Sequence, residues 1–491
     1  TLGFTDAANQ IHMDMEVTVS ISQNDLTWEV TKITKGSGCA KINTIEVPQL
    51  NLITIHDGQE DTQFKGAVNS GNVNATGDRE ITFSDGFRAN ETDTYGYGFL
   101  SANGLSAGVW SNSEAAGDRR ITRNNGSNTI SLTSSAWYYD YGDDPKSAEY
   151  EYTPVSELPC AKVCIAPDLN DDGVTDWQDG AIAYRDIMNN PYGSENVPEL
   201  VNYRIVMNLG SLGPNPFMKS ADNVKKVYLA TDGLPQSIML KGFGNEGHDS
   251  ANSEYGGVAE RLGGIEDLKK LNKIAHQYNT QVGIHVNAQE AYPEAQTFSE
   301  ELIIPSQIMR PTTWGWMDAS YEIDKIKDLG TGLRYKRFLQ LYDQLNGTSL
   351  YQNKWPGVAG QGEPEEEKIP DAATIQKTVA EHLDNPEDLD FIYLDVWYQD
   401  SWESRKIAQQ VNSLGWRFST EFGTSCEYDS TWQHWATEGH YGGSTGKGNN
   451  SEVMRFLRNH QRDSFVLNYP SYGGEADNPL LGHFTLSGFE G

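Results

Sequence analysis

The sequence predicts a multidomain protein in which an N-terminal β-sandwich precedes a (β/α)8-type barrel. Up to about residue 165, short stretches alternate apolar and polar residues with a period of two. Beyond it, strand-like apolar runs alternate with amphipathic helical segments, a pattern typical of a parallel sheet. Neither a GxGxxG turn after a first strand nor a Walker A loop is present, so the pattern favours a barrel over a doubly wound nucleotide-binding fold.

The predicted domains are a sandwich over residues 1–165, a linker over 166–200 and a barrel over 201–491. A length of 491 residues fits several domains at roughly 100–200 residues each. Six strand candidates can be recognised in the barrel region, so we expect the barrel to be incomplete at its C-terminus. Residues 346–389 interrupt the rhythm and include an acidic run at 363–367, which predicts a solvated surface insertion.

The sandwich prediction rests on the alternation of residues 15–21, which continues at Leu26, Trp28 and Val30 after an Asn-Asp turn. Gly, Asn, Asp and Ser separate the segments that follow, and no helical period of useful length intervenes. The further predicted strands cover residues 62–68, 79–83, 97–100, 107–110 and 129–133.

The barrel prediction rests on alternating strands and helices. In the helix predicted over 265–278, Ile265, Leu268, Leu271 and Ile274 share one face. The other predicted helices cover residues 332–345, 401–414 and 451–461. The predicted strands cover residues 203–209, 237–242, 281–286, 390–396, 416–422 and 464–468.

Composition narrows the functional classes. With 37 Lys and Arg against 69 Asp and Glu, the formal net charge is −32, which disfavours binding to nucleic acid or anionic membrane surfaces. The 12 Trp and 24 Tyr are typical of a folded protein that buries or stacks aromatic rings. No apolar stretch approaches the roughly 20 residues of a membrane-spanning helix, so we expect no membrane insertion. Four cysteines are too few for a disulfide scaffold.

The sharpest local motif is the segment 168–179 (DLNDDGVTDWQD), which has the spacing of an EF-hand or dockerin-like Ca²⁺ loop. Glycine at the sixth position permits the sharp turn that such a loop needs. The alternative is a surface turn that leads into a helix over 180–188. The motif favours a structural Ca²⁺ site with ligands from Asp168, Asn170, Asp172, the carbonyl of Val174, Asp176 and Asp179.

Acidic residues follow two neighbouring predicted strands. Asp395 ends the apolar run 391–394, and Glu421 lies at the end of the next strand, with Glu427 six residues further on. The C-terminal ends of barrel strands carry the catalytic residues of such folds. A pair of carboxyl groups about 5–5.5 Å apart performs retaining glycoside hydrolysis. The alternative for each acid alone is a salt bridge at a strand end.

Aromatic residues accumulate near the same strand ends, where flat rings can stack on sugars, although core packing is the alternative for about half of them. His248 and Asp249 follow a predicted strand in a glycine-rich loop and could hydrogen-bond to sugar hydroxyls. The tryptophans in question are Trp314, Trp316, Trp397, Trp402, Trp432 and Trp435.

At these residues the sequence resembles the endo-α-N-acetylgalactosaminidases of glycoside hydrolase family 101. The resemblance covers most of residues 200–491 and extends to the β-domain, which resembles that family's galactose-mutarotase-like sandwich. The segments that carry it are 247–249 (GHD), 283–288 (GIHVNA), 394–397 (LDVW), 427–435 (EYDSTWQHW) and 450–460 (NSEVMRFLRNH).

The resemblance implies a retaining hydrolase that releases Galβ1-3GalNAc from Ser or Thr of mucin-type O-glycoproteins. It implies Asp395 as the nucleophile and Glu427 as the general acid/base, with Glu421 as the rival for the second role. Asp395 must then be ionised and Glu427 protonated before the first step. The implied substrate-binding residues are His248, Asp249, His285, Trp314, Trp316 and Trp397.

Two alternatives remain at this point: a non-catalytic module that binds mucin glycans at a surface, and a different barrel α-glycosidase. The presence of both Asp395 and Glu427 argues against a mere binding module. We expect a monomer that acts outside the cell or at a bacterial cell surface, with a mucin-type O-glycoprotein as substrate and no nucleic-acid partner.

Overall fold

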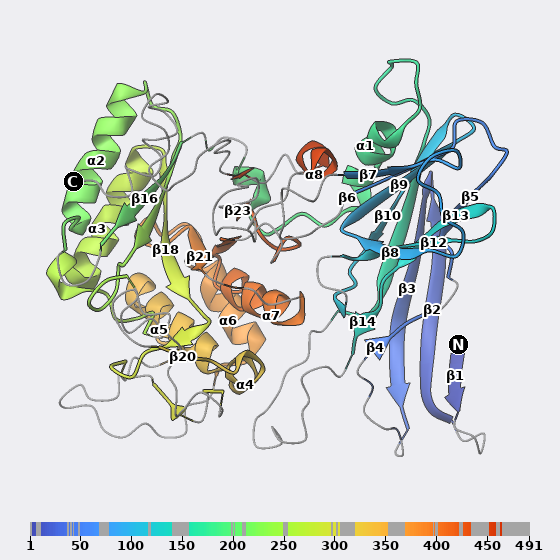
Figure 1. Cartoon of the computed structure of the whole chain (residues 1–491). Coiled ribbons are helices and arrows are strands. Elements are labelled where there is room, and N and C mark those ends of the chain that lie inside the picture. The colour runs from blue at the N-terminus through green and yellow to red at the C-terminus, as the bar shows by residue number, and fades with distance from the viewer. Residues whose placement is uncertain are drawn as a thin grey trace.

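In the computed structural model of the protein, a sandwich unit and a parallel-stranded unit lie side by side (Figure 1). The structure describes the chain except residues 1, 6–10, 37–38, 40–41, 43, 48–49, 68–77, 116–118, 140–156, 198–199, 201, 209–212, 249–253, 296–297, 301–302, 305–319, 352–368, 396, 398–400, 422–425, 434–450, 458–461 and 464–491.

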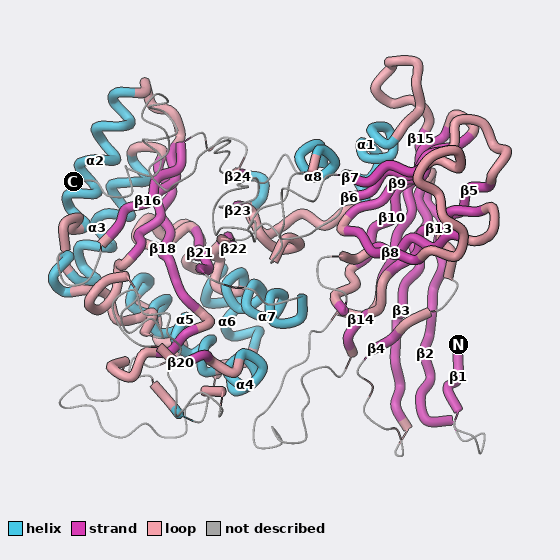
Figure 2. Tube along the Cα trace, in the orientation of Figure 1, coloured by secondary structure: helices cyan, strands magenta, loops and turns pink. Residues whose placement is uncertain are grey.

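Antiparallel strands form the N-terminal unit (Figure 2). One sheet has eight strands, in the order β1 (Leu2–Thr5), β2 (Ile11–Ser22), β3 (Asp25–Lys35), β15 (Cys160–Ala166), β10 (Leu105–Ser111), β9 (Tyr97–Ala102), β6 (Gln63–Ala67) and β7 (Asp78–Ile81). The other has four, in the order β5 (Ile53–His56), β13 (Thr129–Ser134), β12 (Ile121–Asn125) and β8 (Thr92–Tyr95). A short pair joins β4 (Thr44–Ile45) to β14 (Trp137–Tyr138).

Alternating burial explains why these segments are strands. In β3, Trp28 and Val30 are buried and the residue between them is not, which is the period-two pattern of a half-buried strand. The β2–β3 hairpin pairs Ser22 with Asp25, so the turn residues are Gln23 and Asn24, and Gln23 adopts φ 53°. The predicted sandwich is therefore confirmed.

Parallel strands form the C-terminal unit, with neighbouring helices as in a (β/α) barrel (Figure 1). Seven strands are described, in the order β16 (Asn202–Met207), β17 (Gln236–Lys241), β18 (Thr280–Asn287), β21 (Phe391–Asp395), β22 (Arg417–Thr420), β23 (Trp432–Gln433) and β24 (Arg462–Asp463). The helices are α2 (Phe217–Ala230), α3 (Gly264–Gln277), α4 (Lys325–Thr331), α5 (Leu333–Asn346), α6 (Ala372–Ala380), α7 (Ser401–Asn412) and α8 (Glu452–Leu457). A small pair joins β19 (Glu290–Ala291) to β20 (Tyr321–Glu322).

Two details of the barrel differ from the sequence interpretation. Helix α2 was not among the predicted helices, although its buried Phe217, Ala221 and Val224 follow helical spacing. The interruption at 346–389 is not solvated throughout, because α6 places Ile375 and Val379 in the barrel core. The predicted strand at 464–468 lies outside the described residues.

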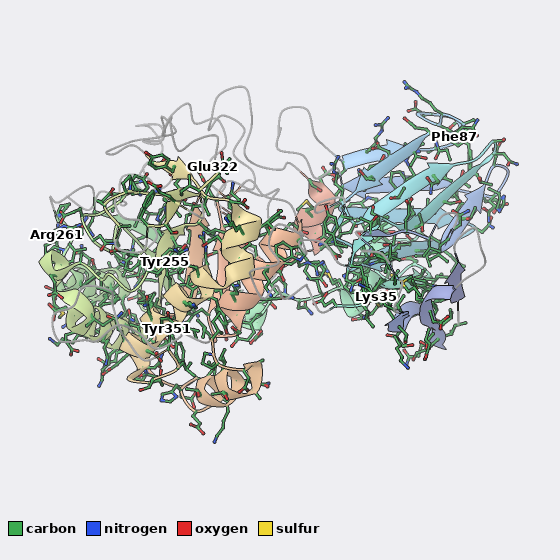
Figure 3. All side chains as sticks on the ribbon, turned by 90° about the horizontal axis from the view of Figure 1, so that it is seen from below. Lys35, Phe87, Tyr255, Arg261, Glu322 and Tyr351 are labelled. Carbon is green, nitrogen blue, oxygen red and sulfur yellow. The ribbon has the colours of Figure 1, made fainter. Side chains whose placement is uncertain are left out.

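A buried arginine cluster stiffens the barrel beside its sheet. Asp328 of α4 lies 2.7 Å from Arg334 Nε and 3.0 Å from Arg337 Nη2 in α5. Arg334 Nη1 also donates to the hydroxyl of Tyr255, at 2.6 Å, and that hydroxyl donates to the carbonyl of Asn287 at the end of β18. Figure 3 shows Tyr255 within the barrel unit. The cluster therefore connects two helices to the edge where β18 ends.

The two units share an apolar interface. Tyr97 and Trp110 of the sandwich belong to one buried cluster with Tyr428 and Val453 of the barrel unit. Helix α1 (Trp177–Ile187) covers the eight-stranded sheet, and α8 lies close to it (Figure 1). Polar contacts add to this packing, since Asp78 of β7 accepts the backbone N–H of Val453 at 2.8 Å. Within the described residues, no helix combines the length and the apolar character that crossing a membrane requires.

Candidate active site

Asp395 is the last residue of β21, at the C-terminal edge of the parallel sheet. In the register of the sheet it lies opposite Asn287, the last residue of β18. Its neighbours in β21 are buried and apolar, so the strand holds the backbone while the carboxyl group emerges at the edge. Barrel enzymes carry their catalytic groups at this edge.

Three basic side chains surround the Asp395 carboxylate. Lys241 Nζ, at the end of β17, lies 3.4 Å from Asp395 Oδ2, and His285 Nε2 of β18 lies 2.7 Å from the same oxygen. Burial alone would raise the pKa of Asp395, but Lys241, His285 and His248 outweigh it and hold that pKa well below 3.8. Asp395 is therefore ionised at neutral pH.

His248 and His285 pack edge to face, with ring centroids 5.0 Å apart. Burial lowers the pKa of both side chains, and the nearby charge of Lys241 lowers it further, so that of His248 lies well below 6.5. Both imidazoles are neutral near pH 7, and a neutral imidazole offers one N–H donor and one acceptor nitrogen. The pair can therefore hydrogen-bond to an uncharged, hydroxyl-rich ligand.

A pocket opens beside these histidines, and its residues come from the segment after β17 and from β18. Gly242 makes the turn out of β17 with φ +81°, and a Cβ there would lie 2.1 Å from the carbonyl oxygen of Asn208. Only glycine fits this position without displacing the neighbouring strand end. The pocket is lined by Gly242, Phe243, Gly244, Asn245, Gly247, His248, Glu254, Tyr255, His285 and Val286.

Glu421 lies next to Asp395 in the sheet. It directly follows β22, whose residues pair with β21 up to Leu394 and Thr420, and its backbone N–H donates to the carbonyl of Leu394 at 3.1 Å. Its side chain is buried. The next pair in this parallel register is Asp395 with Glu421, so both carboxyl-bearing residues end adjacent strands.

Glu427 lies where the barrel unit meets the sandwich. Only 1% of its surface is exposed. The hydroxyl of Tyr97 in β9 donates to Glu427 Oε1, and Arg120 Nη2, just before β12, lies 3.2 Å from Glu427 Oε2. Neither contact could be predicted from the sequence, since both join residues some 300 positions apart.

Among the aromatic candidates, Trp397 differs from expectation. It is fully buried in the barrel core, and its Nε1 donates to Ser404 Oγ of α7 at 2.9 Å. Trp397 is therefore a core residue here and does not present a ring face to a sugar. Trp402 and Trp432 are buried as well. The predicted binding residues Asp249, Trp314 and Trp316, and also Trp435, lie outside the described residues.

The loop at 168–179 is stabilised by its own backbone. Asp176 caps α1 and forms a capping box with Asp179, whose oxygens accept the N–H groups of Leu169 and Asp176 at 2.7 and 2.9 Å. Asp168 Oδ2 accepts the N–H of Gly173, while its Oδ1 is buried without a hydrogen-bond partner.

Some of the predicted Ca²⁺ ligands therefore form hydrogen bonds within the loop and do not point at a common centre. Asp172 Oδ1 accepts the N–H of Val174, and Asn170 Nδ2 donates to Asp172 Oδ2. The described part of the chain contains no group of three or more His, Cys, Asp or Glu side chains arranged to hold a metal ion. The donor set is nevertheless the oxygen-rich kind that Ca²⁺ prefers, and the orphaned Asp168 Oδ1 is a position where a cation would satisfy a buried charge.

Sequence reasoning missed Lys241, Tyr97 and Arg120. Lys241 could have been found, because a charged residue that ends an apolar strand just before a glycine indicates a site residue at the C-terminal edge of the sheet. Nothing local marks Tyr97 or Arg120, because their importance depends on the packing of two domains against each other.

Comparisons with known proteins agree with this architecture. Residues 178–491 match the family model of glycoside hydrolase family 101, described as endo-α-N-acetylgalactosaminidase, and residues 1–177 match a galactose mutarotase-like fold domain. A candidate endo-α-N-acetylgalactosaminidase from Renibacterium salmoninarum is 29% identical over 98% of this chain. The chain spans 29% of that relative's length.

Solved structures show the same fold at low identity. The α-galactosidase of glycoside hydrolase family 36 from Geobacillus stearothermophilus is 9% identical with a TM-score of 0.51, covering 96% of this chain and 63% of its own. The α-galactosidase from Lactobacillus brevis is 10% identical with a TM-score of 0.50, covering 97% of this chain and 60% of its own. The family match extends over more than half of the chain and confirms the resemblance found in the motifs: the chain belongs to glycoside hydrolase family 101, the endo-α-N-acetylgalactosaminidases.

Proposed function

We propose that this chain is the catalytic part of a retaining endo-α-N-acetylgalactosaminidase that releases Galβ1-3GalNAc from Ser or Thr of mucin-type O-glycoproteins. The observation that carries the proposal is the position of Asp395 at the end of β21, with Lys241 and His285 against its carboxylate. A carboxylate at the catalytic edge of a barrel, held ionised by Lys241 and His285, has the properties of a glycosidase nucleophile.

The proposed first step is attack of Asp395 on C1 of GalNAc, with cleavage of the bond from C1 to the Ser or Thr oxygen. The acid donates its proton to that oxygen as it leaves. In the second step the acid, now a carboxylate, takes a proton from water. The water oxygen attacks C1, and the bond from C1 to Asp395 breaks. A substrate without charge suits the neutral His248 and His285 beside the nucleophile.

Glu427 is the proposed acid/base, because the family string begins with it. Glu421 is the rival, because the sheet register makes it the neighbour of Asp395. Leaving-group chemistry separates them: a variant that lacks the acid still forms the glycosyl-enzyme from an activated aryl glycoside, which needs no proton, but loses activity on a glycopeptide.

The test compares Asp395→Ala, Glu427→Ala and Glu421→Ala on Galβ1-3GalNAc linked to a threonine peptide and to an activated aryl group. Asp395→Ala should lose turnover on both, and azide should restore it with a β-linked glycosyl azide as product. Asp390→Ala is the matched control, since Asp390 precedes the same strand at its opposite end and pairs with His276. An α-anomer as the first wild-type product supports retention; a β-anomer would contradict it.

Substrate class is tested in the same assay. The structural neighbours named above are α-galactosidases, so an aryl α-galactoside serves as the competing substrate. Cleavage of the disaccharide substrate with little action on the galactoside supports the proposal. The reverse preference would favour a different barrel α-glycosidase, and glycan binding without turnover would favour a binding module.

We also propose a structural Ca²⁺ at the 168–179 loop, held by Asp168, Asn170, Asp172, the Val174 carbonyl, Asp176 and Asp179. The oxygen-only donor set and the orphaned Asp168 Oδ1 support it. Bound there, the ion would neutralise a loop rich in carboxylates next to the first turn of α1. A monomeric protein acting outside the cell or at a bacterial cell surface is the corresponding proposal for its setting, since its proposed substrate is extracellular.

A further inference from the structure

An arginine of the sandwich domain holds the proposed acid/base of the barrel. Arg120 and Glu427 are each 1% exposed, and Arg120 Nη2 lies 3.2 Å from Glu427 Oε2. Tyr97 donates its hydroxyl to the other carboxyl oxygen. Both oxygens of Glu427 are thus contacted by residues of the sandwich domain.

Aromatic rings fix the guanidinium in place. Arg120 Cζ lies 5.4 Å from the ring centroid of Tyr97 and 5.0 Å from that of Tyr428. Tyr428 is itself covered by Arg405 of α7, whose Cζ lies 3.3 Å from the ring centroid. These rings and its burial keep the guanidinium of Arg120 beside Glu427.

The remaining ionisable groups around Glu427 come from the same packed elements. Tyr184 of α1 is fully buried, and the charges of Arg120 and Glu427 both act on its hydroxyl. Tyr184 and Tyr428 are neutral near pH 7, because burial raises the pKa of both hydroxyls above the ordinary phenol value near 10. Arg120 is thus a charged group in direct contact with Glu427.

We propose that Arg120 is a positioning residue for catalysis, which orients the Glu427 carboxyl group and stabilises the carboxylate that forms when Glu427 gives up its proton. The inference rests on the proposed function and deepens it, since it assigns the sandwich domain a part in the reaction. In the first step the proton moves from Glu427 to the leaving Ser or Thr oxygen, and the negative charge left behind lies against Arg120. In the second step that carboxylate takes a proton from water, and the ion pair is lost until the next cycle.

Three variants test this in the full chain: Arg120→Met, Arg120→Lys and Tyr97→Phe. Arg120→Met should lower kcat/KM on the threonine glycopeptide by about 10²-fold, the lower end of a general-acid contribution, because the acid is misplaced and less ready to ionise. On the activated aryl glycoside kcat/KM should change less than about threefold, since glycosylation then needs no acid. Arg120→Lys should recover most of the loss on the glycopeptide.

The pH profile gives a readout that a purely structural role would not move. Without the guanidinium, the ionised form of Glu427 is less stable, so the alkaline limb of kcat/KM should shift upward by about one unit or more in Arg120→Met. Arg120→Lys should keep the limb near its wild-type position. Tyr97→Phe removes a hydrogen bond to the carboxylate and should shift the limb in the same direction by less.

Arg123→Met is the matched control. Arg123 is also a buried arginine at β12, but it pairs with Glu91 at 3.1 Å and lies over the ring of Phe64. Arg123→Met should lower the melting temperature without changing the ratio of kcat/KM on the glycopeptide to kcat/KM on the aryl glycoside. The inference would be overturned if Arg120→Met lost equal activity on both substrates, or if its alkaline limb did not move. In either case Glu427→Ala would still show the leaving-group dependence expected when the acid is lost. If Glu421→Ala shows the leaving-group dependence and Glu427→Ala does not, the proposed acid assignment itself fails.

Discussion

Removal of the positive charge at Lys241 should raise the pKa of Asp395, the proposed nucleophile. At an effective dielectric constant of about 20, two unit charges 3.4 Å apart attract each other by about 5 kcal/mol. Water entry and relaxation reduce this value, and an opposite charge at such a distance typically lowers a carboxyl pKa by about one to three units. The Lys241→Met variant should therefore raise the pKa of Asp395 by about that amount from its position well below 3.8.

The sign of the effect on activity follows from the role of Asp395. The nucleophile must be ionised, so activity is lost as the pH falls through its pKa. In the wild-type chain this acid limb lies well below pH 3.8, and in Lys241→Met it should move upward. His248 and His285 also lower the pKa of Asp395, so they limit the size of this shift.

The assay is kcat/KM on the activated aryl glycoside, measured from the lowest pH at which the chain stays folded up to about pH 8, with melting temperature followed at each pH. Lys241→Arg retains the charge and serves as the control that should keep the wild-type acid limb. An identical acid limb in wild type and Lys241→Met, at unchanged melting temperature, would refute the electrostatic role of Lys241. A parallel loss at all pH values would show that Lys241 contributes through geometry alone.

Three further predictions concern stability. Asp328→Asn should lower the free energy of unfolding by about 3–5 kcal/mol in urea denaturation, because it leaves Arg334 and Arg337 buried without their carboxylate; a loss below about 1 kcal/mol would contradict this. Because burial lowers the pKa of His248 in the folded state, its contribution to the free energy of unfolding should be fully present above pH 6.5 and be lost as the pH drops toward the folded pKa. In urea denaturation at several pH values, His248→Gln should flatten this dependence. An unchanged dependence would contradict the burial argument. A Ca²⁺ chelator should lower the melting temperature of the wild-type chain but not of Asp172→Ala; equal responses would count against the loop site.

Much of the architecture could be predicted because it follows from local periodicity. The alternation around Trp28 and Val30 produces a strand with one buried face, and the spacing of Leu268 and Leu271 produces the buried side of α3. The helix in the interruption escaped prediction, because the short buried stripe of Ile375 and Val379 is outweighed by its acidic surroundings.

The site divides in the same way. Asp395 and Glu421 could be placed at one sheet edge from the sequence, since each follows an apolar run and parallel strands end together. Whether Trp397 faces a ligand or the core could not be predicted from the sequence, because an aromatic residue after a strand can do either. The contact of its Nε1 with Ser404 of α7 decides for the core.

By itself, the sequence determined the fold class, the family and the identity of the candidate nucleophile, because strand period and motif spacing are properties of residues close together in the chain. Only the tertiary structure decided the electrostatics around those residues. Lys241 and His285 reach Asp395 from separate strands, and Arg120 reaches Glu427 from another domain. The charge state of a buried carboxylate depends on which groups surround it in space, and that is fixed only when distant segments pack together.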